Sequence, residues 1–219
     1  MMVYSLFRKR MLHFTKIQVV QFPVEIVPIG IDTGTYEIND TNGAEDIFHL
    51  GSMDWMPNLE GVKWFLNNVY PQILEKSPSV KIHLAGKGMP EWIYKLRSGN
   101  LMVYGRIENA RQFMYNKKLM IVPLLSGGGM RVKIIEGMAM GRTIISTTIG
   151  AEGIKYKNGY DLLIADNPEE FVMHIIKCLT DKSFAAEIGK NARKLAESEY
   201  DNSVTGKSVI RFYNKLTEK

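Results

Sequence analysis

The strongest structural signal in this chain is the segment 119–141, LMIVPLLSGGGMRVKIIEGMAMG. The apolar run 119–125 predicts a buried strand, and Ser126 with three consecutive glycines predicts the turn that follows it. Residues 131–140 have the spacing of a helix, and Gly141 is typical of a helix end. The segment therefore predicts a strand, a glycine-rich turn and a helix in close succession.

Similar apolar runs lie on both sides of this segment and alternate with helical patterns. Expected strands cover residues 47–50, 80–85, 101–104, 143–146 and 161–165. Expected helices cover residues 57–74, 90–96, 109–116, 168–179, 181–200 and 203–216. Because the strand candidates are continuously apolar, we expect a parallel sheet that is buried on both faces. The predicted fold class is a doubly wound, Rossmann-like α/β sheet with helices on both faces, followed by C-terminal helices.

The first 40 residues do not follow this alternation. Residues 25–28 predict a short strand, GIDTG at 30–34 predicts a turn, and the polar stretch 35–44 predicts a connecting loop. A long connection with little structure of its own usually marks a boundary. We therefore expect an N-terminal basic segment and interdomain linker over residues 1–40, and the α/β domain over residues 41–219.

The composition excludes several classes of protein. Hydrophobic residues make up 45% of the 219 and charged residues 23%, which is typical of a globular chain and not of a disordered one. The single Cys178 excludes a disulfide framework and a multi-cysteine zinc site. Four of the five net positive charges lie in residues 1–22, so the near-neutral remainder argues against nucleic-acid binding. The sequence has no run of 18 apolar residues and no export signal, and we expect a cytoplasmic protein.

Candidate ligand contacts lie where the predicted strands end, because open α/β sheets bind ligands at the carboxyl ends of their strands. Four of the five strand ends begin or continue with glycine, which lets backbone amides approach a ligand closely. The residues at these ends that we select are Gly51, Ser52, Lys87, Gly105, Arg106, Ile107, Gly127, Gly128, Gly129 and Met130.

The three glycines before the predicted helix form the most informative of these ends. The free N–H groups and the dipole of a helix start favour an anion. Arg131 and Lys133 add positive charge that opposes the helix dipole, and a bound di-anion would compensate for it. Glu136 shares a helix face with Lys133. Glycine turns of this kind also serve packing alone, so the residues leave a phosphate site and a packing turn equally open.

Other common motifs do not occur in the sequence. There is no G-x-x-x-x-G-K-[ST], no G-x-S-x-G and no D-x-D, which argues against a P-loop nucleotidase, a serine hydrolase and a metal held by paired carboxylates. The segment 86–88 begins like a dinucleotide fingerprint, but Glu91 replaces the third glycine. We expect His49 and His83 to pack in the core. Trp55 is expected to pack as well, on a loop from which its ring could stack on a ligand.

Four segments together resemble the C-terminal half of GT-B glycosyltransferases of family 4. They are VPIGIDTGTY (27–36), HLGSMDWMPNLEGVKWFLNNVYP (49–71), PLLSGGGMRVKIIEGMAMGRTIIST (123–147) and IGAEGIKYKNGYDLLIAD (149–166). The resemblance covers about residues 25–200, in the order of the family. It implies two Rossmann-like domains facing a cleft, of which this chain holds the one that binds the nucleotide-sugar donor.

The resemblance also implies an activity and its partners. The sugar of a UDP- or GDP-sugar passes to an acceptor held by a missing N-terminal domain, with retained anomeric configuration and with no metal or other cofactor, in bacterial polysaccharide biosynthesis. By the same resemblance, the loop that binds the phosphates corresponds to Gly127 to Met130. The glutamate that binds the ribose corresponds to Glu136, and the loop that contacts the base corresponds to Gly105-Arg106-Ile107. Arg131 and Lys133 would then stabilise the departing diphosphate as catalytic residues. The alternative is a non-catalytic nucleotide-sugar-binding or interaction module with the same fold.

Two departures from the family pattern concern the charges. Many members have a second glutamate eight positions before the ribose contact, where this chain has Gly128. Many also carry an arginine and a lysine in the first loop of this domain, where residues 52–58 hold no cation. We expect Arg131 and Lys133 to take over that charge.

The third departure is the length, because the acceptor domain is absent. Residues 1–24 are expected to be the tail of that domain. The alternative is an anchor to the inner face of the cell membrane, for which their cations and apolar side chains are suited.

Overall fold

The structure is a computed structural model that describes residues 24–38 and 46–217. Its centre is a six-stranded parallel sheet with the strand order β3-β2-β1-β4-β5-β6. The strands are β1 (Ile47–Leu50), β2 (Ile82–Ala85), β3 (Leu101–Gly105), β4 (Leu119–Val122), β5 (Thr143–Ser146) and β6 (Leu163–Ile164). This topology confirms the predicted doubly wound α/β fold.

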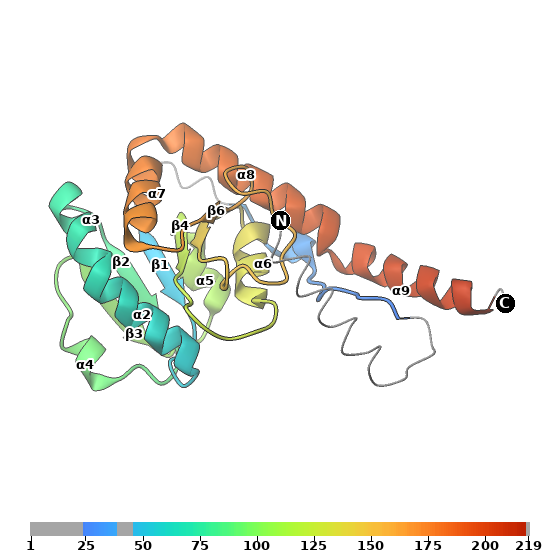
Figure 1. The fold of residues 1–219 in the computed structure, drawn as a ribbon, viewed down its shortest axis with the longest axis horizontal. Helices are drawn as coiled ribbons and strands as arrows, with labels where there is room; N and C mark the ends of the chain where they lie inside the picture. The colour runs from blue at the N-terminus through green and yellow to red at the C-terminus, as the bar shows by residue number, and fades with distance from the viewer. Residues whose placement is uncertain (1–23, 39–45, 218–219) are drawn as a thin grey trace.

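Helices cover both faces of the sheet, and Figure 1 shows them around the central strands. The helices of the described residues are η1 (Thr33–Thr35), α2 (Met56–Asn68), α3 (Tyr70–Lys76), α4 (Glu91–Tyr94), α5 (Ala110–Tyr115), α6 (Val132–Ala139), α7 (Pro168–Thr180), α8 (Lys182–Glu199) and α9 (Asn202–Thr217). One core cluster packs α2, α3 and α7 on the sheet, with Phe65 and Phe171 at its centre. The other packs α5 and α6 on the opposite face, with Phe113 and Met138. Residues of α8 belong to both clusters.

Local chemistry explains where several elements begin and end. Strand β4 ends before Pro123, which has no N–H group to donate to a neighbouring strand. Helices α5, α7 and α8 begin after Asn109, Asn167 and Asp181, whose side chains each accept a hydrogen bond from a backbone N–H of the first turn. Gly141 follows α6 with φ at +69°, the left-handed conformation that commonly ends a helix.

Two predicted elements are wrong in detail, and the strand expected over residues 119–125 ends at Val122. The helix expected over residues 57–74 is two helices, α2 and α3, which meet at Val69. Pro71 accounts for the break, because proline lacks the N–H group and its ring clashes with the carbonyl four residues earlier. The strand expected over residues 25–28 does not form, since no neighbouring strand of the described chain pairs with it. The first pairing in this segment is an isolated bridge between Ile31 and Asp201.

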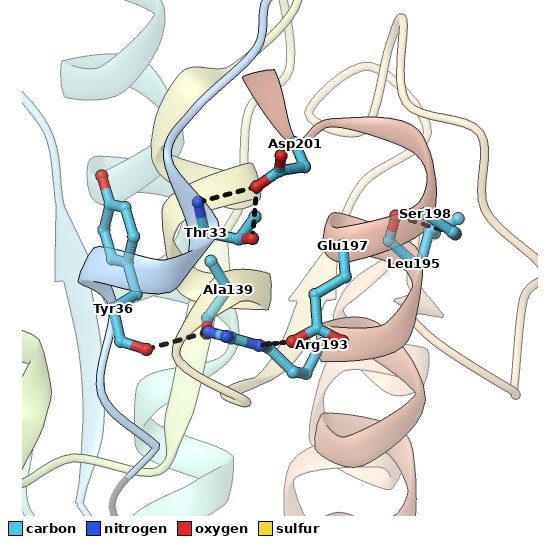
Figure 2. A network of polar contacts seen from close by, with 8 residues as sticks. All are labelled: Thr33, Tyr36, Ala139, Arg193, Leu195, Glu197, Ser198 and Asp201. Atoms are coloured by element: carbon cyan, nitrogen blue, oxygen red, sulfur yellow. Dashed lines mark hydrogen bonds and ion pairs between the residues drawn. The ribbon is translucent and has the colours of Figure 1, made fainter. Parts of the chain in front are cut away.

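The segment around η1 is fixed to the C-terminal helices by a polar network (Figure 2). The backbone N–H and the hydroxyl of Thr33 both donate to Asp201 Oδ2, at 3.1 and 2.5 Å. Arg193 Nη1 donates to the carbonyl oxygens of Tyr36 and Ala139, so it joins this segment to the end of α6. The predicted linker is therefore part of the α/β body from Ile31 to Tyr36, both of which are buried in the second core cluster.

Helix α9 extends away from the sheet and leads to the C-terminus (Figure 1). Thr205 near its start is buried, whereas Ile210, Tyr213 and Leu216 are exposed. None of the helices within residues 24–38 and 46–217 is long and apolar enough to cross a bilayer. The predicted basic segment of residues 1–22 lies outside the described residues.

Asp201→Asn tests the network of Figure 2. Hydrogen bonds from Ser203 and Thr33 hold the pKa of Asp201 well below its ordinary value. The carboxylate therefore adds stability above about pH 4, and this contribution is lost as the pH falls through the lowered pKa. We expect the variant to lose about 1 kcal/mol of unfolding free energy at pH 7 and to show a weaker acid dependence in urea titrations.

The matched control is Glu187→Gln, which removes an exposed carboxylate from α8. If both variants lose the same stability at pH 7 and keep the same acid dependence, the Thr33–Asp201 contact does not anchor the linker.

Candidate functional site

A cavity of about 500 Å³ opens at the carboxyl ends of the strands. It lies where the strand order reverses between β1 and β4, the position at which open α/β sheets bind ligands. Loops that follow β1, β2, β3 and β4 form its wall. Eight of the predicted site residues line it: Gly51, Ser52, Lys87, Arg106, Ile107, Met130, Arg131 and Lys133.

Five predicted residues are not part of the cavity wall. They are Gly105, Gly127, Gly128, Gly129 and Glu136. Gly105 directly precedes Arg106, and the three glycines directly precede Met130, so four of the five lie next to residues of the wall. Glu136 is one turn along α6 from Lys133, which lines the wall.

The three glycines form a loop that packs against Trp55. Gly127 and Gly129 have φ values of +98° and +91°, which side-chain-bearing residues rarely adopt. A Cβ atom at Gly127 would also lie 2.9 Å from the Trp55 ring, closer than two carbon atoms approach. Glycine is therefore required there both for the backbone turn and for the close contact with the ring.

Arg131 precedes α6 and projects its charge into this region. Its guanidinium lies 4.9 Å from the centre of the Trp55 ring, and its Nη1 donates to the carbonyl oxygens of Gly128 and Gly129. Burial lowers the pKa of Arg131, and the charge of Glu152 opposes that shift. Arg131 Nε and Nη2 are buried and have no hydrogen-bond partner within the part of the chain that the structure describes.

Two buried and unpartnered nitrogen donors on a cation are costly, because they have lost water without gaining an acceptor. An anionic oxygen beside the glycine loop would satisfy them with charge-assisted hydrogen bonds. The electrostatics of Arg131 therefore fit the anion-binding interpretation of this turn better than packing alone.

Lys133 and Glu136 interact with each other. Lys133 Nζ lies 2.5 Å from Glu136 Oε2, while the hydroxyl of Tyr36 donates to Glu136 Oε1 at 3.0 Å. Burial and the charge of Glu136 raise the pKa of Tyr36, and the Arg111 guanidinium lies 4.1 Å from its ring centre. Both carboxylate oxygens of Glu136 thus have partners, one of which comes from the linker. No pattern in the sequence indicates Tyr36 as a site residue, since it lies 100 residues before Glu136.

His49 and His83 are buried, as the sequence analysis expected, but His49 also contributes to the cavity wall. Its Nδ1 lies 3.0 Å from the carbonyl oxygen of Ile121, and burial lowers its pKa to about 4. His49 is therefore neutral at pH 7, with its proton on Nδ1. His83 contacts Asp46 and Tyr104 away from the cavity wall.

Within residues 24–38 and 46–217, no three His, Cys, Asp or Glu side chains are grouped to hold a metal ion.

These features define the class of protein: a Rossmann-like domain with a ligand cavity at the switch point of its sheet. The chain belongs to the group 1 glycosyl transferases, whose family model matches residues 44–181, more than half of its length. The resemblance noted in the sequence is thereby confirmed.

Two curated relatives are similar over most of the same region. An uncharacterized 44.6 kDa protein in the cps region of Klebsiella pneumoniae is 28% identical over 185 residues, which cover 80% of this chain and 47% of that protein. An uncharacterized glycosyltransferase of Methanocaldococcus jannaschii is 24% identical over 137 residues, which cover 60% of this chain and 38% of that protein. The chain therefore spans less than half the length of these two relatives.

Solved structures share the fold. HepE of Anabaena, in complex with UDP and glucose, superposes with a TM-score of 0.70 at 14% identity, over 87% of this chain and 56% of that one. The C-terminal domain of a group 1 glycosyl transferase, LpcC of Francisella tularensis, superposes with a TM-score of 0.66 at 14% identity, over 79% of this chain and all of that domain. The match to LpcC agrees with the predicted C-terminal half.

Trp55→Ala tests the role of the ring that supports Arg131. The variant loses the cation–π contact, so the guanidinium is expected to be released. A cation–π contact contributes about 0.5–1 kcal/mol, and we therefore expect the variant to bind pyrophosphate roughly two- to fivefold more weakly in a calorimetric titration. Trp92→Ala is the control, because Trp92 is similarly exposed on α4 but does not line the cavity. Equal affinities in the two variants would contradict a supporting role for Trp55.

Proposed function

We propose that this chain is the donor-binding part of a glycosyltransferase that uses a nucleoside-diphosphate sugar. The observation that carries the proposal is the Arg131 guanidinium, which has two buried donors without partners beside a loop of three glycines. A diphosphate group supplies the acceptor oxygens that these donors lack. The family match and the UDP and glucose named with the similar fold of HepE support a nucleotide sugar as the ligand.

In this proposal, Arg131 acts on the charge of the leaving group. When the bond between sugar and phosphate breaks, negative charge grows on the diphosphate while the sugar becomes oxocarbenium-like. A preorganised cation and nearby N–H donors lower the free energy of that state. The sugar is transferred with retained configuration and without a metal ion, and a phosphate oxygen takes the proton of the acceptor.

We assign the other predicted residues to the phosphates, the base and the ribose of the donor. The loop Gly127 to Met130 binds the phosphates, and Gly51, Ser52 and Lys87 border the same cavity. Gly105-Arg106-Ile107 contacts the base, which is uracil or guanine. Glu136 binds the ribose hydroxyls, since a carboxylate accepts hydrogen bonds from both. The contact between Lys133 and Glu136 supports a further role for Lys133, which is to hold Glu136 in place in addition to its expected role at the departing diphosphate.

A second domain is proposed to hold the acceptor and to join this chain through the linker around η1. The chain spans less than half of its two curated relatives, which leaves room in such proteins for a domain of that size. We propose that the complete enzyme works in bacterial polysaccharide biosynthesis at the cytoplasmic side of the membrane. The competing function is a module that binds nucleotide sugar without catalysis, and the absence of an acid at Gly128 is the feature that favours it.

Arg131→Ala tests the proposed phosphate contact. We expect the wild-type chain to bind UDP or GDP in a calorimetric titration, and the variant to bind the same nucleotide at least about tenfold more weakly, because a charge-assisted hydrogen bond contributes about 1.5–3 kcal/mol. Binding of the nucleoside alone should change little.

Lys63→Ala is the control for Arg131→Ala, since it removes an exposed cation from α2 outside the cavity wall. Absence of nucleotide binding by the wild-type chain would refute the proposed function. Equal loss of nucleoside and nucleotide in Arg131→Ala would refute only the role of Arg131.

Tyr36→Phe tests the proposed ribose contact, because it removes the hydroxyl that holds Glu136. A hydrogen bond of this kind contributes about 1 kcal/mol, so nucleoside and nucleoside diphosphate should both bind about fivefold more weakly. Tyr213→Phe, which changes an exposed tyrosine on α9, should leave both affinities unchanged. A loss confined to the diphosphate would contradict the assignment of Glu136 to the ribose.

A further inference from the structure

A carboxylate that the sequence analysis did not select lies against the glycine loop. The backbone N–H of Gly129 donates to Glu152 Oε2 at 3.0 Å. Glu152 belongs to the connection between β5 and β6, so it reaches the loop from a different segment of the chain. A Cβ atom at Gly128 would lie 3.8 Å from the same oxygen. Glu152 therefore places an acid beside Gly128, which has no side chain of its own.

The position of this acid has an electrostatic cost in a site for a diphosphate. Like charges a few ångströms apart repel each other, and partial burial strengthens the repulsion. The nearby Arg131 offsets part of it, since Glu152 raises the pKa of that guanidinium against the effect of burial. Within the residues that the structure describes, Glu152 Oε2 accepts the hydrogen bond from Gly129, and a carboxylate can accept several hydrogen bonds. The partly buried Glu152 therefore has further acceptor capacity for the donors of a ligand.

We propose that Glu152 accepts hydrogen bonds from the hydroxyl groups of the sugar that is transferred. This inference rests on the proposed function. The sugar is bonded to the terminal phosphate of the donor, so phosphates at the glycine loop bring its hydroxyl groups within reach of the side chains beside Gly128 and Gly129. Sugar hydroxyls are donors, and they match an acceptor-only carboxylate. Glu152 is then a specificity-determining residue for the sugar and not for the nucleotide.

The same contact permits a competing role for Glu152. Its carboxylate satisfies the Gly129 N–H in the absence of ligand, and a diphosphate would displace it from that amide. In that case removal of the charge strengthens the binding of nucleoside diphosphate and of nucleotide sugar alike. The two roles therefore predict different ratios of the two affinities.

The test is Glu152→Gln, in which the carbonyl oxygen of the new side chain can still accept the Gly129 hydrogen bond, so the loop is expected to keep its shape. Affinities are measured by calorimetry for the pairs UDP and UDP-glucose, and GDP and GDP-glucose, on the purified chain. For the pair that the wild-type chain binds, we compare the affinity for the nucleotide sugar with the affinity for the nucleoside diphosphate. We expect Glu152→Gln to lower this ratio of affinities about tenfold from its wild-type value. Glu152→Asp, which keeps the charge and shortens the reach, should also weaken the nucleotide sugar selectively.

Glu60→Gln is the matched control, because Glu60 Oε2 accepts a hydrogen bond from Ser126 at the other end of the same loop. It should leave the ratio of the two affinities unchanged. A Glu152→Gln variant with equal changes in both affinities would overturn the inference while the proposed function stands. If the wild-type chain binds none of the four nucleotides, the proposed function fails and the inference fails with it.

Discussion

The position of the Arg131 guanidinium depends on two loops that the parallel sheet brings together. Strands β1 and β4 are neighbours, so the loop that carries Trp55 and the glycine loop lie at the same edge of the sheet. The ring supports the guanidinium, and the carbonyl oxygens of Gly128 and Gly129 hold Nη1. The remaining donors of Arg131 are left for a ligand. This arrangement adds the charge of Arg131 to a wall that also holds Lys87, Arg106 and Lys133, and the proposed diphosphate site follows from it.

The linker is connected to the same site through side chains. Thr33 and Tyr36 anchor it to Asp201 and Arg193, and the hydroxyl of Tyr36 continues to Glu136. A displacement of the segment Ile31 to Tyr36 would therefore reach the carboxylate that we assign to the ribose. In the two-domain enzyme that we propose, this path would join the orientation of the acceptor domain to the donor site.

Much of the fold was predictable because it depends on local patterns. The strand predicted over residues 143–146 matches β5 at both ends, and capping residues such as Asn167 and Asp181 mark helix starts. The errors arose where a pattern has more than one outcome: residues 57–74 are helical on both sides of a break, and residues 25–28 find no strand to pair with.

The candidate site was predictable only in part. Spacing along one helix indicated that Lys133 and Glu136 share a face, and they form an ion pair. Spacing says nothing about side chains that approach from distant segments, which is why Tyr36 at Glu136 and Glu152 at Gly129 were missed.

The proposed function depends above all on the binding of the donor diphosphate by Arg131 and the glycine loop. A crystal structure of the chain with UDP or GDP would locate the phosphates. We expect phosphate oxygens at about 3 Å from Arg131 Nε or Nη2. Phosphates bound elsewhere, with these two nitrogen atoms still unpartnered, would contradict it.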